Sequence, residues 1–311
     1  MVIQTHQPLD LPSAKWLNRE KLTLVVANTM LQEILGLDGE LQVADIGAAA
    51  ITEVPPYKVL LDRNLAVLNA FDADPRQHQS ILDAYGDKVA IFTEIVGDGR
   101  AGTLHLASPA SGMSSLLQPS QAHLEFFNGF KSFGRVHETV EVQTTRLDDV
   151  GGLPDLDYLK MDIQGAELAA LKGGANRLRN CVCVQLEVSF VPLYRDQPCF
   201  GEVDLWMRSQ GYLPHTFTEV KRWSVSPAIR DGNFRVPFNQ LIEADIVYLR
   251  DLTKPDDLTD DQLRKVGLIS HFCYKSPDIV CRILAALADR GAIKASAMLS
   301  YIGAAGVTLY G

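Results

Sequence analysis

Short apolar segments that end beside an acidic residue alternate with helical segments along the first two thirds of this chain. Residues 41–46 and 66–71 are two such apolar runs, and a proline that suits the first turn of a helix follows each of them, Pro55 after the first and Pro75 after the second. Strands that alternate with helices form a parallel sheet, because each helix carries the chain back across the sheet before the next strand begins. This alternation predicts an α/β protein with a doubly wound, mostly parallel sheet of seven strands.

The remaining elements follow from the same kind of pattern. Residues 156–163 and 181–188 are nearly continuous apolar runs, which are typical of parallel strands buried on both faces. We also expect strands at residues 89–96, 139–144, 212–217 and 244–249, an antiparallel excursion at 103–106, and helices at 55–65, 165–178 and 198–210 and from residue 75. Four phenylalanines between residues 107 and 136 recur at mostly helical spacing, which favours a packed amphipathic helix over a lid on a substrate site.

The chain divides into three parts by pattern. Residues 1–40 have helical spacing and Gly36 ends their last helix, so they form a helical lead-in. Residues 41–250 contain the strands and form the ligand-binding domain. Residues 251–311 are helical again and are expected to be an extension outside the sheet, because every candidate site residue precedes them.

Composition excludes several functional classes. Lysine and arginine total 29 against 38 aspartates and glutamates, a net charge of −9, which argues against a nucleic-acid partner. No apolar run is long enough to span a membrane, and residues 1–10 lack the features of a secretory signal, so we expect a cytoplasmic protein. The five cysteines suit a reducing compartment, and Cys181 and Cys183 are expected to be small buried residues.

The turn after the first strand is a candidate ligand site. Asp45 and Gly47 let a ligand approach the backbone closely, and Ala48 follows them. A pyrophosphate-binding turn carries three spaced glycines, of which only Gly47 is present here. The turn therefore favours a nucleoside ligand without a pyrophosphate.

Two acids follow the next strands. Asp72 ends the second strand, where a carboxylate accepts hydrogen bonds from ribose hydroxyls, and we assign the capping of the following helix to Asp74. Asp98 follows the third strand and is either an adenine neighbour or an ordinary turn residue.

The most specific segment is Lys160-Met161-Asp162-Ile163-Gln164-Gly165-Ala166-Glu167, preceded by Thr145-Arg146-Leu147-Asp148-Asp149 and followed by Leu171-Lys172-Gly173. This succession resembles the signature of the FkbM family of S-adenosylmethionine-dependent methyltransferases. The likeness continues through residues 184–190, 192–195 and 211–212, and includes residues 112–116, so it covers roughly residues 41–217 in order.

The resemblance implies a Rossmann-like class I methyltransferase fold and S-adenosylmethionine as cofactor. It implies methylation of a hydroxyl on a sugar, a glycoconjugate or a secondary metabolite. The residues that we expect at the cofactor are Asp45, Gly47, Ala48, Asp72, Asp98, Gln164 and Gly165.

Two carboxylates are the candidates for catalysis. Asp162 and Glu187 end two strands that would be neighbours in the sheet, so both side chains face the crevice where such sheets bind ligands. Acids this close could share a proton, which would raise the pKa of one of them, or could hold a divalent cation. Lys160 lies on the same strand face as Asp162 and is the third candidate.

Two other functions stay open at this point. One is a nicotinamide-dependent oxidoreductase on a related sheet, which the missing glycines disfavour. The other is a degenerate methyltransferase fold without activity that serves as a binding protein, motivated by the alanines at residues 48–50 where the family usually has more glycine. A small molecule or glycan is the expected partner, and a homo-oligomer is possible.

Overall fold

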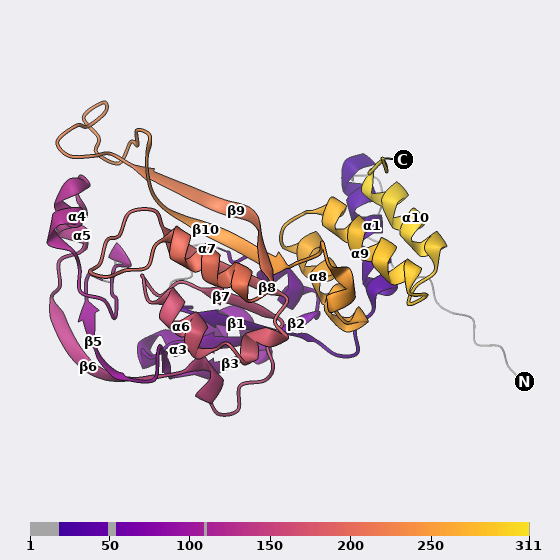
Figure 1. Ribbon diagram of the computed structural model, residues 1–311, viewed down its shortest axis with the longest axis horizontal. Helices are drawn as coiled ribbons and strands as arrows, with labels where there is room; N and C mark the ends of the chain where they lie inside the picture. Colours follow the sequence, from indigo (N-terminus) through magenta and orange to yellow (C-terminus); the bar gives the residue numbers. More distant parts are fainter. Residues whose placement is uncertain (1–18, 49–53, 109–110, 311) are drawn as a thin grey trace, which may run out of the picture.

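A single seven-stranded sheet organises the molecule (Figure 1), and its strands follow the order β3-β2-β1-β7-β8-β10-β9. The computed structural model describes residues 19–48, 54–108 and 111–310, with no side-chain description before residue 27. The sheet strands are β1 (Leu41–Ile46), β2 (Ala66–Phe71), β3 (Val89–Phe92), β7 (Tyr158–Met161), β8 (Cys183–Ser189), β9 (Tyr212–Trp223) and β10 (Gln240–Arg250). The first five are mutually parallel, whereas β10 is antiparallel to both β8 and β9. The predicted doubly wound, mostly parallel sheet of seven strands is therefore confirmed.

The strand order changes direction between β1 and β7, and this position matters for function. β2 and β3 follow β1 toward one edge of the sheet, and β7 lies on the opposite side of β1. The helices that follow β1 and β7 consequently leave the sheet on opposite faces. A crevice opens at such a point outside the carboxyl ends of the strands, and open α/β sheets bind their ligands there.

Helices cover both faces of the sheet. On one face α6 (Glu167–Gly173) and α7 (Phe200–Ser209) pack against the side chains of alternate strand residues, including Ile46, Met161 and Leu186. On the other face α2 (Lys58–Asp62) and α3 (Pro75–Tyr85) pack with residues such as Val43 and Tyr158. Every residue of β8 is buried, which agrees with the continuous apolar run in the sequence.

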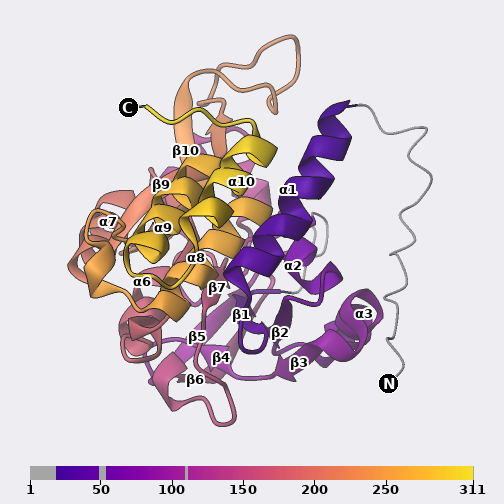
Figure 2. The same ribbon diagram turned by 90° about the vertical axis from the view of Figure 1, so that its right-hand side faces the viewer.

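The helices at the two ends of the chain form one layer rather than two appendages. Figure 2 shows α1 (Arg19–Leu35) beside α8 (Asp260–Phe272), α9 (Pro277–Asp289) and α10 (Ala295–Ala305). Leu35 of α1, Val266 of α8 and Leu284 of α9 belong to the same buried core as Val43 of β1. The expected helical extension contains α8, α9 and α10, which add no strand to the sheet but share one buried core with it, because their apolar sides cover the amino-terminal half of that face.

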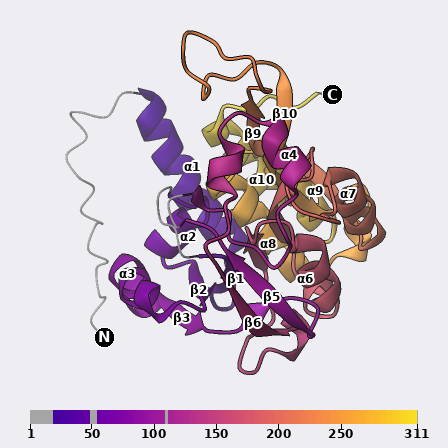
Figure 3. The same cartoon turned by 90° about the vertical axis from the view of Figure 1, so that its left-hand side faces the viewer.

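A second, smaller sheet differs from expectation. The run at residues 89–96 divides into β3 and a short strand β4 (Ile95–Val96), which pairs with β6 (Glu138–Thr145) in the order β4-β6-β5, where β5 is Ala101–Leu106. The antiparallel excursion expected at residues 103–106 is β5. Figure 3 shows β5 and β6 in front of the main sheet, on the side that carries the carboxyl ends of its parallel strands.

The phenylalanine-rich segment folds as two short helices, not as one long one. These are α4 (Gln121–Phe126) and α5 (Phe130–Phe133). Gly129 lies between them with a left-handed φ of 84°, so the chain changes direction before α5 begins. Phe127 and Phe130 are buried against Leu193 and Trp223 at the far end of the β9–β10 hairpin. The packed interpretation therefore holds for Phe127, Phe130 and the partly buried Phe133, whereas Phe126 is exposed and the single helix is wrong.

Candidate functional site

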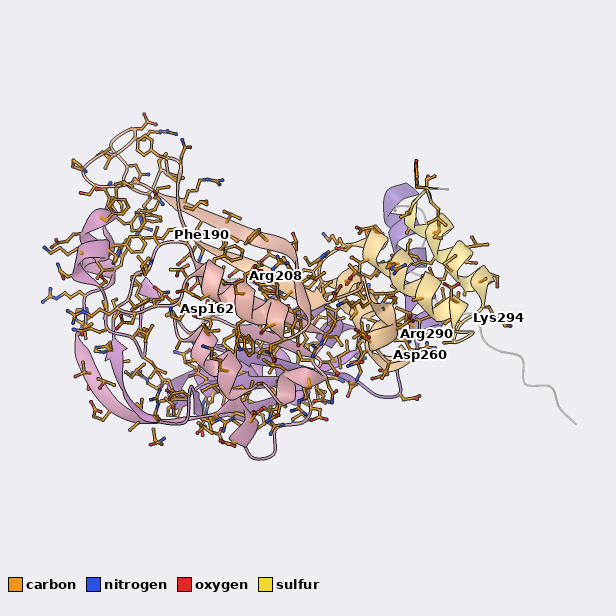
Figure 4. The ribbon with its side chains drawn as sticks, in the orientation of Figure 1. Asp162, Phe190, Arg208, Asp260, Arg290 and Lys294 are labelled. Carbon is orange, nitrogen blue, oxygen red and sulfur yellow. The ribbon has the colours of Figure 1, made fainter. Side chains whose placement is uncertain are left out.

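A pocket of about 360 Å³ opens at the carboxyl ends of β1, β7 and β8, where the strand order reverses. Its wall is strongly charged, with five acids and two lysines: Asp45, Asp162, Glu187, Glu219, Asp245, Lys160 and Lys221. Figure 4 shows Asp162 well apart from Asp260 and Arg290, which mark the helical layer. The pocket thus occupies the carboxyl-terminal half of the sheet face whose amino-terminal half the helical layer covers.

The turn after β1 forms one side of this pocket, and Asp45, Gly47 and Ala48 all line it. Gly47 has a φ of 95°, and a Cβ built on it would lie 2.0 Å from the carbonyl oxygen of Asp162. A side chain at this position would push β1 and β7 apart at their ends. Gly47 is therefore required for the close approach of the two strand ends that border the pocket.

Asp45 is buried at the base of the pocket and has two partners. Its Oδ2 accepts a hydrogen bond of 2.5 Å from the Tyr57 hydroxyl, and its Oδ1 lies 3.3 Å from Nζ of Lys160. Burial, followed by the Asp45 carboxylate, raises the pKa of Tyr57 far above its ordinary value, so Tyr57 stays a hydrogen-bond donor at every working pH.

Lys160 faces the pocket as expected, but its ion-pair partner is Asp45 rather than Asp162. Burial by itself would lower the pKa of Lys160, and the carboxylates of Asp45 and Asp162 outweigh it, so the pKa lies above the usual value. Lys160 is therefore a fixed positive charge in the pocket wall and not a proton acceptor.

Asp162 and Glu187 are brought together by one side chain. Nε2 of Gln164 donates a hydrogen bond of 2.8 Å to Oδ1 of Asp162 and another of 2.8 Å to Oε2 of Glu187. The parallel register of β7 and β8 pairs Met161 with Leu186, which places the two acids side by side one residue later. Both carboxylates line the pocket.

The Gln164 side chain and backbone are held from several directions. Its backbone has a φ of 56°, its carbonyl accepts from the Ser115 hydroxyl at 2.6 Å, and its Oε1 accepts from the Tyr194 hydroxyl at 3.3 Å. The buried carboxylate of Glu167 accepts hydrogen bonds from the backbone N–H groups of Ile163 and Gly165 and so fixes the turn. The amide that bridges the two acids is thus rigidly placed.

The turn also explains the last residues of the signature segment. Gly165 has a φ of 101°, and a Cβ there would contact the side chain of Gln197 at about 3 Å. Gly165 does not line the pocket described above, and neither does Gln164, so both act on the site through the position of Asp162 and Glu187. Burial raises the pKa of Glu167 to about 7.

Glu187 has a cationic neighbour that the sequence did not indicate. Nζ of Lys221 on β9 lies 3.3 Å from Oε1 of Glu187 and 2.8 Å from Oε1 of Glu243. Burial, followed by the carboxylates of Asp162 and Glu243, raises the pKa of Glu187 well above its ordinary value, and Lys221 opposes this. A carboxylate with a raised pKa is a stronger base than the carboxylate of an exposed glutamate.

At the end of β2, Asp74 has the capping role expected of it, and Asp72 makes different contacts. The Asp74 side chain caps α3 by accepting from the backbone N–H of Arg76. Asp72 accepts from the backbone N–H of Asp74 through Oδ1, while its Oδ2 is buried and has no hydrogen-bond partner among the described residues. Asp72 lies outside the pocket lining, at the end of the strand next to β1.

Asp98 lies away from the pocket. It is exposed on the turn after β4 and forms an ion pair with Arg100, and it does not line the pocket. The reason is the division of the third strand: β4 leaves the main sheet at residue 95 and takes Asp98 with it into the smaller sheet. The structure supports the turn interpretation of this residue.

The donor set around the two acids does not fit a metal ion. Nε2 of Gln164 donates to Oδ1 of Asp162 and to Oε2 of Glu187, and Nζ of Lys221 lies 3.3 Å from Oε1 of Glu187. These are the oxygens that a divalent cation would need. Among the residues that the structure describes, no three His, Cys, Asp or Glu side chains are grouped so that they could hold a metal. Cys181 and Cys183 are buried free thiols.

Several pocket residues were not identified from the sequence. Tyr57 carries no motif, and Gln185 lies within the family-like run 184–190 but was not a candidate itself. Lys221 and Asp245 come from the β9–β10 hairpin, beyond the end of the family resemblance at residue 217. The polar residue within the apolar run of β8 was the one available signal for Gln185, because a buried amide needs a polar partner. Across the described ranges, none of the helices combines the length and apolarity needed to cross a bilayer.

A curated protein with a related sequence is a methyltransferase. The chain is 28% identical over 148 residues to the 2-O-methyltransferase NoeI of Sinorhizobium fredii, a match that covers 43% of this chain and 58% of NoeI, so the chain spans little more than half the length of this relative.

Two solved structures to which the chain is similar are TYW2 of M. jannaschii in complex with AdoMet and a SAM-dependent methyltransferase of Agrobacterium tumefaciens. The first is 10% identical, covers 76% of this chain and 78% of its own, and has a TM-score of 0.31. The second is 10% identical, the match covers 75% of this chain and 62% of that structure's chain, and the TM-score is 0.30.

The family comparison covers the site itself. The methyltransferase FkbM domain matches residues 45–214, which is more than half of the chain and extends from Asp45 through Asp162 and Glu187. This chain belongs to the FkbM methyltransferase family.

Proposed function

We propose that this protein is an S-adenosylmethionine-dependent O-methyltransferase whose acceptor is a hydroxyl group. The observation that carries the proposal is the pair of carboxylates, Asp162 and Glu187, fixed by one amide in the wall of a pocket at the switch point of the sheet. Methylation of a hydroxyl requires a group that removes its proton, and a buried acid with a raised pKa suits that task.

The residues around the pocket fit the proposed cofactor. S-adenosylmethionine supplies an electrophilic methyl group on a positively charged sulfur. Asp72 has a buried oxygen without a partner, which is the kind of atom that a ribose hydroxyl would satisfy. At the other side of the switch point, the Asp45 carboxylate can accept a hydrogen bond from a cationic group and the Lys160 ammonium can donate one to an anionic group. An excess of acids over lysines in the wall favours a cationic ligand.

Glu187 is the residue that we assign to proton removal, with Asp162 as its partner. The carboxylate of Glu187 accepts the proton of the acceptor hydroxyl, and its raised pKa makes that transfer easier than it would be to an exposed glutamate. Gln164 keeps the two carboxylates in fixed positions, so the acceptor meets a prearranged base.

A sugar, a glycoconjugate or another polyhydroxylated small molecule is the acceptor class that we favour. Carboxylates such as Glu219 and Asp245 at the pocket can accept hydrogen bonds from neighbouring hydroxyls of a neutral acceptor. The same carboxylates would repel a phosphorylated or otherwise anionic one. The similarity to a 2-O-methyltransferase points in the same direction.

The test combines binding with turnover. Calorimetric titration with S-adenosylhomocysteine and with NADH should give binding of the first and none of the second. Incubation with S-adenosylmethionine labelled in the methyl group and a panel of neutral oligosaccharides should transfer label to a hydroxyl. Preference for NADH would overturn the proposal in favour of an oxidoreductase. Tight binding of S-adenosylhomocysteine without transfer to any hydroxyl compound would favour the non-catalytic alternative.

A further inference from the structure

One buried amide in the pocket has a role that the carboxylate pair does not explain. Gln185 lies in the middle of β8, is only 3% exposed, and lines the pocket. Its Oε1 accepts a hydrogen bond of 2.9 Å from the Tyr158 hydroxyl and one of 3.0 Å from the Tyr274 hydroxyl. Within the part of the chain that the structure describes, nothing accepts a hydrogen bond from its Nε2. Because Gln185 lines the pocket, its Nε2 can donate to a ligand there.

The two tyrosines determine which way this amide points. Tyr158 and Tyr274 also contact each other through their hydroxyls, so two phenolic protons must find acceptors in the cluster. With Oε1 of Gln185 turned toward the tyrosines, each proton has an acceptor. If the amide were reversed, one phenolic O–H group would have no oxygen to donate to. An unsatisfied donor in a buried position lowers the stability of the fold. The N–H groups of Gln185 are therefore directed away from the tyrosines.

Tyr274 belongs to the helical layer and not to the strands. It lies between α8 and α9, in residues that follow the family match, which ends at residue 214. Its ring packs on Tyr158 with centroids 6.3 Å apart. The helical layer consequently supplies one of the two groups that orient a side chain of the pocket.

Gln185 has a cationic neighbour on the next strand. The register of β7 and β8 places Lys160 directly opposite Gln185, and both side chains line the pocket. A lysine ammonium and an amide N–H group on neighbouring strands of one pocket can together donate to a carboxylate. Asp45, on the other side of Lys160, offers an acceptor to an ammonium.

We propose that Gln185 and Lys160 bind the carboxylate of the amino-acid end of the cofactor, and that Tyr274 of the helical layer is a positioning residue for Gln185. The inference rests on the proposed function, because it assigns a group of S-adenosylmethionine to a place in the pocket. An α-amino acid presents a carboxylate and an ammonium, which match these two donors and Asp45.

The experiment varies the ligand and the residue together. The probes are S-adenosylhomocysteine and the same thioether without its carboxylate, 5′-deoxy-5′-(3-aminopropylthio)adenosine, each titrated into the purified full chain. We expect the wild-type protein to bind the first about 10- to 100-fold more tightly than the second, the range for hydrogen bonds to a charged group. Equal affinity for the two would overturn the inference without any variant.

The variants then assign this preference to residues. Gln185→Leu should reduce the preference by roughly tenfold. Gln185→Glu has the same shape and adds a negative charge, so it should favour the ligand without the carboxylate. Tyr274→Phe should reduce the preference by about two- to fivefold, because the amide loses one of two orienting bonds.

A matched control separates this effect from loss of stability. Tyr301→Phe removes another buried phenol of the helical layer, one that bonds to His271 far from the pocket, and should leave the preference unchanged. A folded Gln185→Leu or Gln185→Glu protein with the full wild-type preference would overturn the assignment. A wild-type protein that binds neither ligand would contradict the proposed function itself, whereas one that binds both equally contradicts only this inference.

Discussion

Nζ of Lys221 lies 3.3 Å from Oε1 of Glu187 and joins the outer hairpin to the acid at the end of β8. The ammonium favours the ionised form of Glu187, whereas burial and the neighbouring carboxylates of Asp162 and Glu243 favour the protonated form. The second influence is larger, so the pKa of Glu187 is raised. Lys221 limits this rise, and in the proposed mechanism it thereby sets the pH range in which Glu187 accepts a proton.

We expect Lys221→Met to move the acidic side of the pH–kcat profile to higher pH, by about one unit or more. Glu187 acts as a base only when it is ionised, and without Lys221 its pKa rises further, so a higher pH is needed for the same ionised fraction. Lys131→Met, which removes an exposed ion pair with Glu125, is the control and should leave the profile unchanged. An unshifted profile in Lys221→Met would remove Glu187 from proton transfer.

Asp162 and Glu187 should behave as one unit. Asp162→Asn and Glu187→Gln should each bind S-adenosylhomocysteine as the wild type does and lose roughly 10²- to 10⁴-fold in kcat, the usual effect of removing a general base. The double variant should be little slower than either single one, because residues that act together are strongly non-additive. Losses that multiply in the double variant would show that the acids act independently, and wild-type turnover in Asp162→Asn would exclude it from catalysis.

Asp72→Ala should weaken the binding of S-adenosylhomocysteine by about 1.5–3 kcal/mol, because it removes an acceptor from the ribose hydroxyls. Asp74→Ala is the matched control two residues away. It removes the cap of α3, which should cost about 1 kcal/mol of folding stability without changing the dissociation constant. Calorimetry and urea unfolding of both variants separate the two effects. Equal affinity in Asp72→Ala and the wild type would contradict the ribose assignment.

Metal chelation should leave turnover unchanged. The oxygens of Asp162 and Glu187 already accept hydrogen bonds from Gln164, and Lys221 adds a positive charge beside them. The measurement is kcat after dialysis against EDTA, with and without added Mg²⁺. Loss of activity on chelation and its return with Mg²⁺ would contradict the arrangement described here.

His271 should make the fold sensitive to acid. Its ring nitrogens lie 2.7 Å from Oδ1 of Asn28 and 3.0 Å from the Tyr301 hydroxyl, and burial, followed by the charge of Arg63, lowers its pKa to about 4. The unfolded chain takes up this proton near pH 6.5 and the folded chain only near pH 4, so the free energy of unfolding falls as the pH drops between these values, by about 3 kcal/mol.

Urea unfolding of the wild type and of His271→Gln across pH 4–7 tests this expectation. The variant keeps a neutral polar side chain at the site and should lose this part of the pH dependence. A variant with the same pH dependence as the wild type would assign the effect to other groups.

The strands could be predicted because each carries its own local signal. Apolar runs that stop at an acid identified β1, β2, β7 and β8, and the adjacency of β7 and β8 placed Asp162 beside Glu187. Parallel strands of one crossover unit are neighbours by default, so this step needed no long-range information. The division of the third strand at residues 93 and 94 had no comparable signal, and Asp98 was consequently placed near the cofactor.

The partners of these residues could not be predicted in the same way. Apolar spacing shows which side of α1 or α8 is buried, but it does not name the surface that buries it. The ion pair of Lys221 with Glu187 and the hydrogen bond of Tyr274 with Gln185 join residues 34 and 89 positions apart in the chain. Such contacts depend on how the outer hairpin and the helical layer dock, which no local pattern encodes.

The shared core of the two chain ends has a consequence for biosynthesis. Leu31 of α1 and Leu41 of β1 are synthesised before Ile283 and Ile302, with which they pack in one cluster. Until translation has passed α10, the apolar strand residues of this cluster lack part of their cover. A ribosome that stalls before α10 is complete therefore releases a chain whose sheet face is partly uncovered, and exposed apolar surface of this kind favours aggregation.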